Sequence, residues 1–593
     1  MKTRKVTAFV ALTLAAALAF TGCGAAQSDT TDTQTVTAVE IVSDDDAADT
    51  AKTVTTVDSV YDLEISDRDA SGDYDAASAV TLDPNGDLTI TAAGTYLLSG
   101  TYSGTIVVAA PEDAKVQLVL SDATIAVSDG PAIYVQSADK VFLTAADGTV
   151  NTISDGSSYT YTDGDTDVDA AVFSKADLTV NGSGKLTVTG NAKHAIVSKD
   201  DLVVTAADLT VTAANVALNG KDSVKIVNAT VTATAGSDAV RSDNDEDASR
   251  GYIYVAGSTL TLTAASDALQ AQTGIVLVDA TIDATAAGGH TSRSDESGKG
   301  LKAGVDITVA GGTYTFDTLG DAVHADGSVT VTDGQLTIAT ADDGIHADNT
   351  VTIAGGTVTV TTSNEAIEGV NVTLSGGTTY LTSSDDAVNA TSGGTLTVSG
   401  GYHVLTCGGD GLDANGTINV TGGVTLISGP TNNGNGSLDY DATATVTGGV
   451  VIALGSTGMA MSFSSAENQG AILASVGSQS AGTSFAVVDE SGNVVASFTS
   501  AVSYACALVT APGIQSGSSY TLVCGGAVSD ADANGFATSG TVSGGTTVAT
   551  VDMTSNLYAT SGLSMGQMGG QMGGMGQMGQ MGQMGGFGGP GHN

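Results

Sequence analysis

Short runs of alternating apolar and polar residues, separated by glycine pairs, fill the central part of the chain. In the run 357–361, valines and threonines alternate, and Gly355 and Gly356 precede it. A period of two in β-branched residues predicts β-strands with one buried face, and paired glycines predict turns between them. We therefore expect many short strands whose valines face inward and whose threonines face solvent.

A four-residue phrase recurs through this region at a nearly constant interval. Each copy contains an acidic, a small, an aliphatic and a polar residue, and the copies begin at Asp321, Asp343, Glu365, Asp386 and Asp410, in steps of 22, 22, 21 and 24 residues. Three short strands in about 22 residues cannot form a closed domain, but they can form one coil of a right-handed parallel β-helix. Weaker copies begin at Pro131, Ala170, His194, Val216, Asp238, Asp267 and Lys299. The sequence thus predicts an all-β solenoid of about 12 coils with three strands each.

Stacking of such coils predicts two columns of polar side chains. Strands of successive coils lie about 4.8 Å apart, so equivalent positions lie above one another. The first column contains the five acidic residues that begin the phrase, and the second contains His324, His346, Glu368, Asn389 and Asp413. Two carboxylates at this separation repel each other by roughly 3 to 4 kcal/mol at an effective dielectric near 20. This repulsion favours raised carboxylate pKa values or a bound cation.

Calcium suits a column of carboxylates because it accepts six to eight oxygen ligands in flexible geometry. The alternative is a set of turn residues that point into water. The candidate Ca²⁺ ligands are Asp321, Asp342, Asp343, Glu365, Glu368, Asp385, Asp386, Asp410 and Asp413.

The N-terminus has the composition of an export signal. Three basic residues within the first five positions precede an apolar run that ends at Phe20, too short for a permanent membrane helix. Thr21 and Gly22 before Cys23 resemble the bacterial lipobox, although Phe20 stands where leucine is usual. We expect a lipoprotein signal peptide over 1–22, lipid on Cys23 and an extracellular protein anchored to the bacterial cell membrane. A plain secretory signal is the alternative.

The remaining composition predicts four further segments. Residues 23–57 are acidic and poor in large apolar side chains, which is typical of a disordered tether. The repeat region, 58–435, is the predicted parallel β-helix, and 436–560, with a hairpin pattern at 489–493, is the predicted antiparallel β unit that caps it. The Met, Gly and Gln repeat of 561–593 predicts a disordered tail, for which Cu(I) ligation by thioethers is a weaker alternative.

Charge and cysteine content narrow the partners. The chain has 64 Asp and Glu against 18 Lys and Arg, a formal net charge of −46. Such an excess repels phosphate backbones, so nucleic acid is excluded as a direct partner. Four cysteines in 593 residues do not make a disulfide framework, and pairing of Cys506 with Cys524 stays open.

Several stretches resemble the bacterial carbohydrate-binding β-helix family. They are DDGIHADNTVTI (342–353), SNEAIEG (363–369), SDDAVNA (384–390), GKGLKA (298–303) and GSTGMA (455–460). The resemblance covers roughly residues 60 to 550. It implies a calcium-binding surface protein that binds cellulose and polygalacturonate, with a fold related to calcium-dependent pectate lyases.

Three functions are compatible with these features. The first is non-catalytic binding of a polysaccharide, in which Ca²⁺ bridges uronate and protein carboxylates, and Tyr314, Tyr380 and Tyr402 contact neutral sugars unless they pack at coil edges. The second is a polysaccharide lyase of the pectate type, with Lys299 or Lys302 as the base, unless these lysines form structural ion pairs. The third is a structural cell-surface adhesin.

Overall fold

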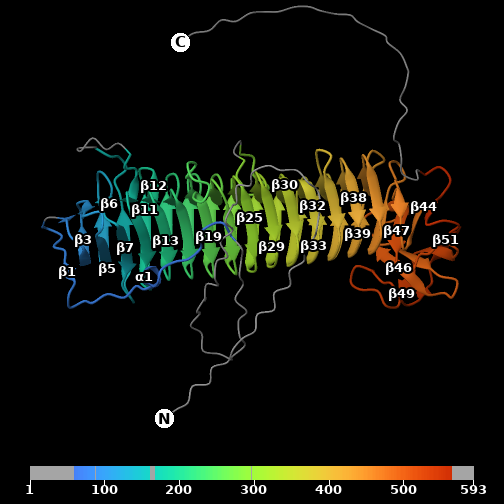
Figure 1. Cartoon of the computed structure of the whole chain (residues 1–593), viewed down its shortest axis with the longest axis horizontal. Coiled ribbons are helices and arrows are strands. Elements are labelled where there is room, and N and C mark those ends of the chain that lie inside the picture. The colour runs from blue at the N-terminus through green and yellow to red at the C-terminus, as the bar shows by residue number, and fades with distance from the viewer. Residues whose placement is uncertain (1–58, 87, 161–166, 295–296, 564–593) are drawn as a thin grey trace, which may run out of the picture.

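The structure is a computed structural model that describes residues 59–86, 88–160, 167–294 and 297–563. The expected signal peptide, Cys23, the tether and all but the first three residues of the tail therefore lie outside the described residues. The described chain forms one long stack of coils with a small β unit at its C-terminal end (Figure 1).

Three parallel ladders of strands build the stack. The first contains β2 (Thr89–Ile90), β4 (Ile106–Ala109), β6 (Ile133–Ser137), β9 (Ala170–Ser174), β12 (His194–Ser198), β15 (Leu218–Gly220), β18 (Val240–Ser242), β21 (Leu269–Ala271), β24 (Leu301–Ala303), β27 (Val323–Ala325), β30 (Ile345–Ile353), β32 (Ile367–Leu374), β34 (Val388–Ala390), β37 (Leu412–Ala414) and β40 (Leu438–Tyr440).

The second ladder also takes up the first part of β3 and β5 and the last part of β30 and β32. Its strands are β1 (Val80–Thr81), β3 (Gly94–Tyr102), β5 (Lys115–Ala126), β7 (Lys140–Ala145), β10 (Asp177–Asn181), β13 (Asp201–Thr205), β16 (Ser223–Val227), β19 (Tyr252–Ala256), β22 (Ile275–Val278), β25 (Asp306–Ala310), β28 (Ser328–Val331), β35 (Thr395–Val398), β38 (Thr417–Val420), β41 (Thr443–Val446) and β43 (Ser465–Ala466).

The third ladder starts with the last part of β3 and β5. It continues through β8 (Val150–Ser154), β11 (Lys185–Gly190), β14 (Asp208–Ala213), β17 (Thr230–Ala235), β20 (Thr259–Ala264), β23 (Thr281–Ala286), β26 (Thr313–Thr318), β29 (Gln335–Thr340), β31 (Thr357–Thr362), β33 (Thr378–Thr382), β36 (Tyr402–Thr406), β39 (Val424–Ser428) and β42 (Val450–Gly455).

The predicted alternation decides which side chains enter the core. In β20, Leu260 and Leu262 are buried and Thr259 and Thr261 are exposed. Because every coil repeats this pattern, the inward residues form one continuous apolar core along the stack. The parallel β-helix expected from the sequence is confirmed.

The solenoid has more coils than the sequence indicated, about 16 instead of about 12. The additional coils lie at the two ends, where the acidic phrase is missing. At the C-terminal end, Leu438 pairs in parallel with Leu412, and β41 and β42 pair with β38 and β39. The parallel β-helix therefore continues beyond residue 435, because coil stacking requires the inward aliphatic residue and not the acid before it.

An antiparallel unit closes the C-terminal end of the stack, as expected. Its strands are β44 (Gly470–Gln479), β45 (Ser484–Val488), β46 (Val494–Thr499), β47 (Tyr504–Ala511), β48 (Ser519–Cys524), β49 (Ala527–Val528), β50 (Val542–Ser543), β51 (Thr546–Asp552) and β52 (Leu557–Ala559). Strand β47 pairs antiparallel with β42, which ends the third ladder. Cys407, Cys506 and Cys524 are buried free thiols, so the bridge between Cys506 and Cys524 is not formed.

The N-terminal segment lies along the outside of the stack, which the sequence did not predict. Tyr61 stacks on Tyr252 with ring centroids 4.7 Å apart, and Asp62 pairs with the buried Lys225 at 3.2 Å. Further along, Asp69 of α1 (Asp67–Ala70) pairs with Lys140 at 2.7 Å. Helix α1 has four residues, and the described part of the chain contains no helix that could cross a membrane.

Candidate functional site

One column of side chains runs along the outer face of the first ladder. In successive strands, Lys302 pairs in register with His324, His324 with His346, and His346 with Glu368. The register continues from Glu368 through Asn389 and Asp413 to Asp439. We call the seven residues Lys302, His324, His346, Glu368, Asn389, Asp413 and Asp439 the strand column. The predicted second column is therefore present, and the same register extends it to Lys302 at one end and Asp439 at the other.

A second column lies at the turns that lead into these strands. It contains Asp267, Lys299, Asp321, Asp343, Glu365, Asp386 and Asp410, and we call it the turn column. The carboxylates hold neighbouring coils together through backbone hydrogen bonds: Oδ1 of Asp321 accepts from the N–H of Asp343 at 3.2 Å, and Oδ1 of Asp386 accepts from the N–H of Asp410 at 2.5 Å. One oxygen of such an acid is thus structural, and the other is available for a charged partner. The two columns together form the acidic stripe.

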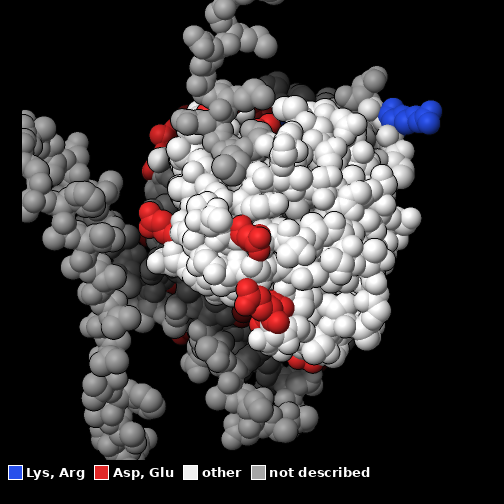
Figure 2. All heavy atoms as spheres, turned by 90° about the vertical axis from the view of Figure 1, so that its right-hand side faces the viewer, with Lys and Arg blue, Asp and Glu red and all other residues white. Residues whose placement is uncertain are grey.

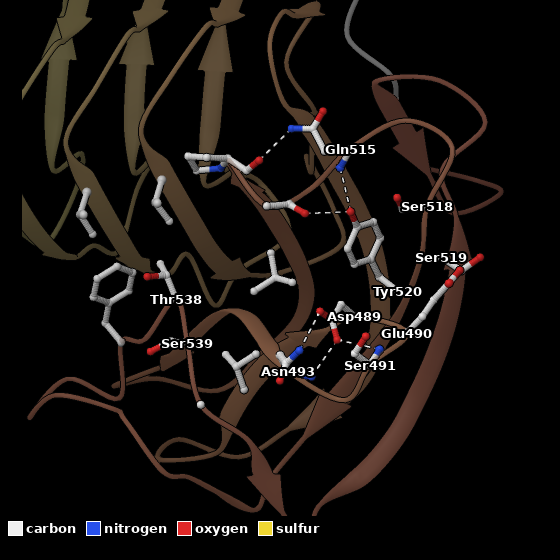
Figure 3. A pocket seen from close by; sticks show the side chains of 18 residues that line it. Asp489, Glu490, Ser491, Asn493, Gln515, Ser518, Ser519, Tyr520, Thr538 and Ser539 are labelled. Carbon is white, nitrogen blue, oxygen red and sulfur yellow. Dashed lines mark hydrogen bonds between the residues drawn. The ribbon is translucent and has the colours of Figure 1, made fainter.

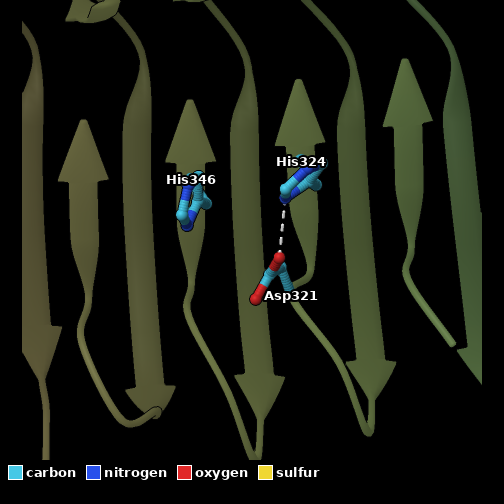
Figure 4. Close-up of side chains that lie close together, drawn as sticks. All are labelled: Asp321, His324 and His346. Atoms are coloured by element: carbon cyan, nitrogen blue, oxygen red, sulfur yellow. Dashed lines mark hydrogen bonds and ion pairs between the residues drawn. The ribbon is translucent and has the colours of Figure 1, made fainter. Parts of the chain in front are cut away.

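Basic partners neutralise the N-terminal half of the acidic stripe, from Asp267 to His346. Oδ2 of Asp321 lies 2.6 Å from Nζ of Lys299 and 2.8 Å from Nδ1 of His324. In the next coil, Oδ2 of Asp343 lies 3.2 Å from Nδ1 of His346. Figure 4 shows His324 and His346 on successive strands, with Asp321 below His324, and their ring centroids are 4.9 Å apart.

The pKa values in this half reflect the pairing. Burial alone raises the pKa of Asp321, but the hydrogen bond with His324 and the charge of Lys299 outweigh it and hold that pKa below its usual range. The hydrogen bond with Asp343 raises the pKa of His346 to about 9, against the opposing effect of burial. At neutral pH Asp321 is therefore ionised, and His346 is protonated.

The C-terminal half of the stripe, from Glu365 to Asp439, contains no basic side chain of its own, and only Glu368 lies within 4.8 Å of a histidine among the described groups, His346 of the preceding coil. Residues 303–593 contain 22 Asp and Glu and no Lys or Arg. Among the described residues, no ion pair joins Asp386, Asp410 or Asp413 to a basic side chain. The ion pairs that neutralise the acids one or two coils earlier are therefore absent at these three residues.

Uncompensated burial raises the carboxylate pKa values in this half. Burial, with the charge of neighbouring acids, raises the pKa of Asp410 and of Asp413 to about 7. Burial, then the hydrogen bond and charge of Glu368, raises the pKa of Glu365 to about 9. These acids resist ionisation unless a cation joins them.

An unsatisfied amide oxygen lies inside this half. Asn389 is 9% exposed, and its Nδ2 donates to Oε2 of Glu365 at 3.1 Å, but its Oδ1 has no hydrogen-bond partner. In the next two coils, Asp410, Asp413 and Asp439 each offer an oxygen within 4.8 Å of the others. An all-oxygen donor set with a buried acceptor lacking a donor fits a hard cation such as Ca²⁺.

Other predicted calcium ligands take peripheral or shared positions. Asp342 and Asp385 are exposed. Asp342 nevertheless belongs to one group with Asp321 and Asp343 whose oxygens lie within 4.8 Å. Asp385 lies in the turn before Asp386, where its backbone carbonyl accepts from the N–H of Gly409 at 2.9 Å.

The sequence interpretation missed Asp439 and a separate group formed by Asp177, Asp200 and Asp201. Asp439 follows the small and aliphatic residues Ser437 and Leu438, so the phrase was detectable without its leading acid. In the other group, Asp177 and Asp201 begin β10 and β13 and Asp200 directly precedes β13, and no repeat of the phrase marks these positions.

Both lysines considered as a base are engaged. Lys299 pairs with Asp321, as described, and Nζ of Lys302 lies 3.6 Å from Oδ2 of Asp267. Their arrangement agrees with structural ion pairs.

The three candidate tyrosines have different environments. Tyr314 is 0% exposed in the core, so its prediction as a sugar contact was wrong: Thr313 and Thr315 take the outward positions of β26, and the residue between them must face inward. Tyr380 is 40% exposed on β33. Tyr402 is partly buried, and its hydroxyl donates to Oδ2 of Asp532 in the cap at 2.7 Å.

The fold and the stripe together define an elongated β-solenoid with a linear array of side chains on one face, which is a surface suited to a chain-like ligand. A sequence model described as "Carbohydrate-binding domain-containing protein" matches residues 84–344 and 341–550. The chain belongs to this carbohydrate-binding family, and a polysaccharide is its expected class of partner.

The chain was also compared with solved structures and with curated proteins. A solved structure from C. thermocellum, titled as a polysaccharide lyase-like protein in a gadolinium derivative, is 32% identical, covers 34% of this chain and 82% of that one, and superposes with a TM-score of 0.33. No curated protein matches the chain.

Proposed function

We propose that this protein is a non-catalytic, calcium-dependent binder of acidic polysaccharides such as polygalacturonate, held at the bacterial surface by lipid on Cys23. The observation that carries the proposal is the C-terminal half of the acidic stripe. There, half-buried carboxylates stack in register without an ion-pair partner, and the pKa values of Asp410 and Asp413 are raised.

A bound calcium ion offsets the electrostatic repulsion between these closely spaced carboxylates. A divalent ion among Asp410, Asp413 and Asp439 replaces carboxylate repulsion with attraction and favours the ionised forms of Asp410 and Asp413. Neighbouring acids in the column and Oδ1 of Asn389 offer further oxygens of the kind that calcium prefers.

Calcium also explains how so negative a protein binds an acidic glycan. Without a cation, uronate carboxylates and the stripe repel each other. An ion held by protein oxygens has coordination positions left for a uronate, and so bridges the two. In the N-terminal half, Lys302 is partly exposed, with 42% of its side chain accessible, and offers a direct positive contact for a neighbouring uronate.

The test is a pull-down on polygalacturonate with calcium and with a chelator. We expect binding only with calcium, and a loss of about tenfold or more in affinity, at least 1.4 kcal/mol, for Asp410→Asn combined with Asp413→Asn. The matched control is Glu112→Gln combined with Asp113→Asn, which removes the same charge from an exposed turn at the other end of the stack.

The same experiment separates the other functions. Unsaturated product that absorbs in the ultraviolet would identify a lyase and contradict the proposal. Absence of both product and binding would leave an adhesin. Calcium-dependent capture without product supports the binder.

A further inference from the structure

A cleft of about 1000 Å³ lies where the C-terminal cap meets the outer face of the solenoid, away from the acidic stripe. Val424 of β39 and Val450 of β42 form its solenoid side, and the turn 489–495, the loop 512–519 and the loop 536–540 form its cap side. Figure 3 shows these segments around the cleft, with Tyr520 at one wall. Its volume is at the upper end of the range of about 300 to 1000 Å³ for small-molecule sites.

Hydrogen bonds fix the walls before any ligand arrives. Asp489 accepts from the backbone N–H groups of Ser491 and Asn493 at 2.9 and 2.8 Å, which closes the hairpin turn. The hydroxyl of Tyr520 accepts from the N–H of Gln515 and donates to the carbonyl of Gly513, both at 2.8 Å. A site with such preformed walls loses little conformational entropy on binding.

Tyr402 holds the third wall in place. Its hydroxyl donates to Asp532 and accepts from Nδ2 of Asn534 at 3.0 Å, and its ring lies edge-on to Phe536 with centroids 6.0 Å apart. The backbone N–H of Val494 donates to the carbonyl of Gly540 at 2.9 Å, which ties the other end of this loop to β46. Tyr402, predicted as a sugar contact, therefore positions a wall of the cleft.

The lining combines apolar and polar side chains. The apolar ones are Val424, Val450, Val494, Val495, Pro512, Tyr520 and Phe536. The polar ones carry hydroxyl, amide and carboxylate groups, namely Asp489, Glu490, Ser491, Asn493, Gln515, Ser518, Ser519, Thr538 and Ser539. Such a lining suits a ligand with an apolar face and hydroxyl groups at its edges, which describes a sugar ring.

The charge of the lining determines whether the cleft favours neutral or acidic sugars. The lining contains the carboxylates of Asp489 and Glu490 and no Lys, Arg or His. Figure 2 looks onto this end of the molecule, whose surface is mostly uncharged with scattered acidic side chains. The cleft therefore disfavours a uronate, and no cluster of metal ligands in the described residues lies in it to reverse that preference.

We propose that this cleft binds an uncharged oligosaccharide, independently of calcium. The inference rests on the carbohydrate-binding role of the protein, and every lining residue lies within the second matched segment, 341–550. Acidic and neutral stretches of a mixed polysaccharide then have separate sites on one chain: the acidic stripe for uronates and the cleft for neutral sugars. Tyr380, exposed on β33 next to the strand of Tyr402, extends the neutral surface outside the cleft.

The test measures binding of neutral hexasaccharides of glucose, mannose and xylose by calorimetry, with a chelator present. Thr538→Trp fills the cleft from an exposed lining position, and Thr261→Trp places the same residue on an exposed threonine of β20 as a control. We expect at least one neutral hexasaccharide to bind the natural protein and Thr261→Trp equally, and Thr538→Trp about tenfold more weakly or worse. Asp410→Asn combined with Asp413→Asn should leave this binding unchanged.

Two results would overturn the inference. One is that no neutral hexasaccharide binds, or that Thr538→Trp binds it as the natural protein does. The other is that oligolysine binds, that Thr538→Trp prevents its binding, and that no neutral sugar binds. This result would identify a cation site. Because neither result involves calcium or polygalacturonate, failure here is distinct from failure of the function proposed above.

Discussion

The two halves of the acidic stripe share one repeat, one strand register and one backbone hydrogen-bond pattern, yet they differ in electrostatics. In the N-terminal half, Asp321 and Asp343 have Lys299, His324 and His346 within ion-pair distance. In the C-terminal half, the strand column carries Glu368, Asn389, Asp413 and Asp439 at the equivalent positions. The difference shows that coils with the same register can carry either paired or unpaired acids, depending on whether lysine or histidine occupies the neighbouring positions of the two columns.

The largest effect is expected from breaking a neutralised pair. Asp321→Asn leaves the ammonium of Lys299 without its carboxylate in a site where 15% of the lysine side chain is exposed. We expect a loss of about 3 kcal/mol in the free energy of unfolding. Chemical denaturation measures it, and Asp326→Asn, which removes an exposed partner of His324, is the control with an effect below about 1 kcal/mol. Equal effects of the two substitutions would refute the described pairing.

The next largest effect is expected from calcium binding in the C-terminal half of the stripe. Calcium at 100 times its Kd should raise the free energy of unfolding by about 2.7 kcal/mol, because the ion binds only the folded stripe. Asp410→Asn combined with Asp413→Asn should abolish this gain, whereas Asp321→Asn should keep it. Thermal unfolding with calcium or chelator is the measurement. Loss of the calcium effect in Asp321→Asn instead would contradict the proposed difference between the two halves.

The pH dependence of the metal-free protein sharpens the contrast. The pKa of Asp413 is about 7 in the folded protein, against about 3.9 for an unfolded aspartate. A raised pKa contributes stability that is present below pH 4 and is lost as the pH rises through 7, by about 1 kcal/mol after screening by solvent. Asp321 behaves in the opposite way, since its lowered pKa adds stability above pH 4 that acidification removes.

Stability measured from pH 4 to 8 in chelator should therefore fall less steeply for Asp413→Asn than for the natural protein. Calcium should stabilise the natural protein more at pH 8 than at pH 5, because protons compete with the ion. A calcium effect that does not change with pH would contradict the raised pKa values.

The smallest effect is expected at Lys302. Its ion pair with Asp267 spans 3.6 Å and is partly exposed, so Lys302→Met should cost less than about 1 kcal/mol. Binding to polygalacturonate should weaken slightly, and no ultraviolet-absorbing product should form with either protein. Product formed by the natural protein and lost in Lys302→Met would assign a base to this lysine.

Much of the fold and part of the site could be predicted from the sequence. The spacing of the phrase was enough to place His324, His346 and Glu368 in one column, because parallel coils of equal length must stack in register. The inward position of Tyr314 could also have been predicted, since its neighbours Thr313 and Thr315 take the outward positions of the same strand. The cleft could not be predicted, because Val424, Tyr520 and Phe536 are far apart in the chain and no repeat relates them.

By itself, the sequence determined the solenoid, the direction of its side chains and the two columns, because a period of two along a strand and a period near 22 along the chain are properties of local geometry that repeats. Only the tertiary structure decided which acids have partners, where the stack ends and where the cap leaves a cleft. These depend on distances between side chains from different coils and from the cap, and on burial, neither of which any stretch of the sequence contains.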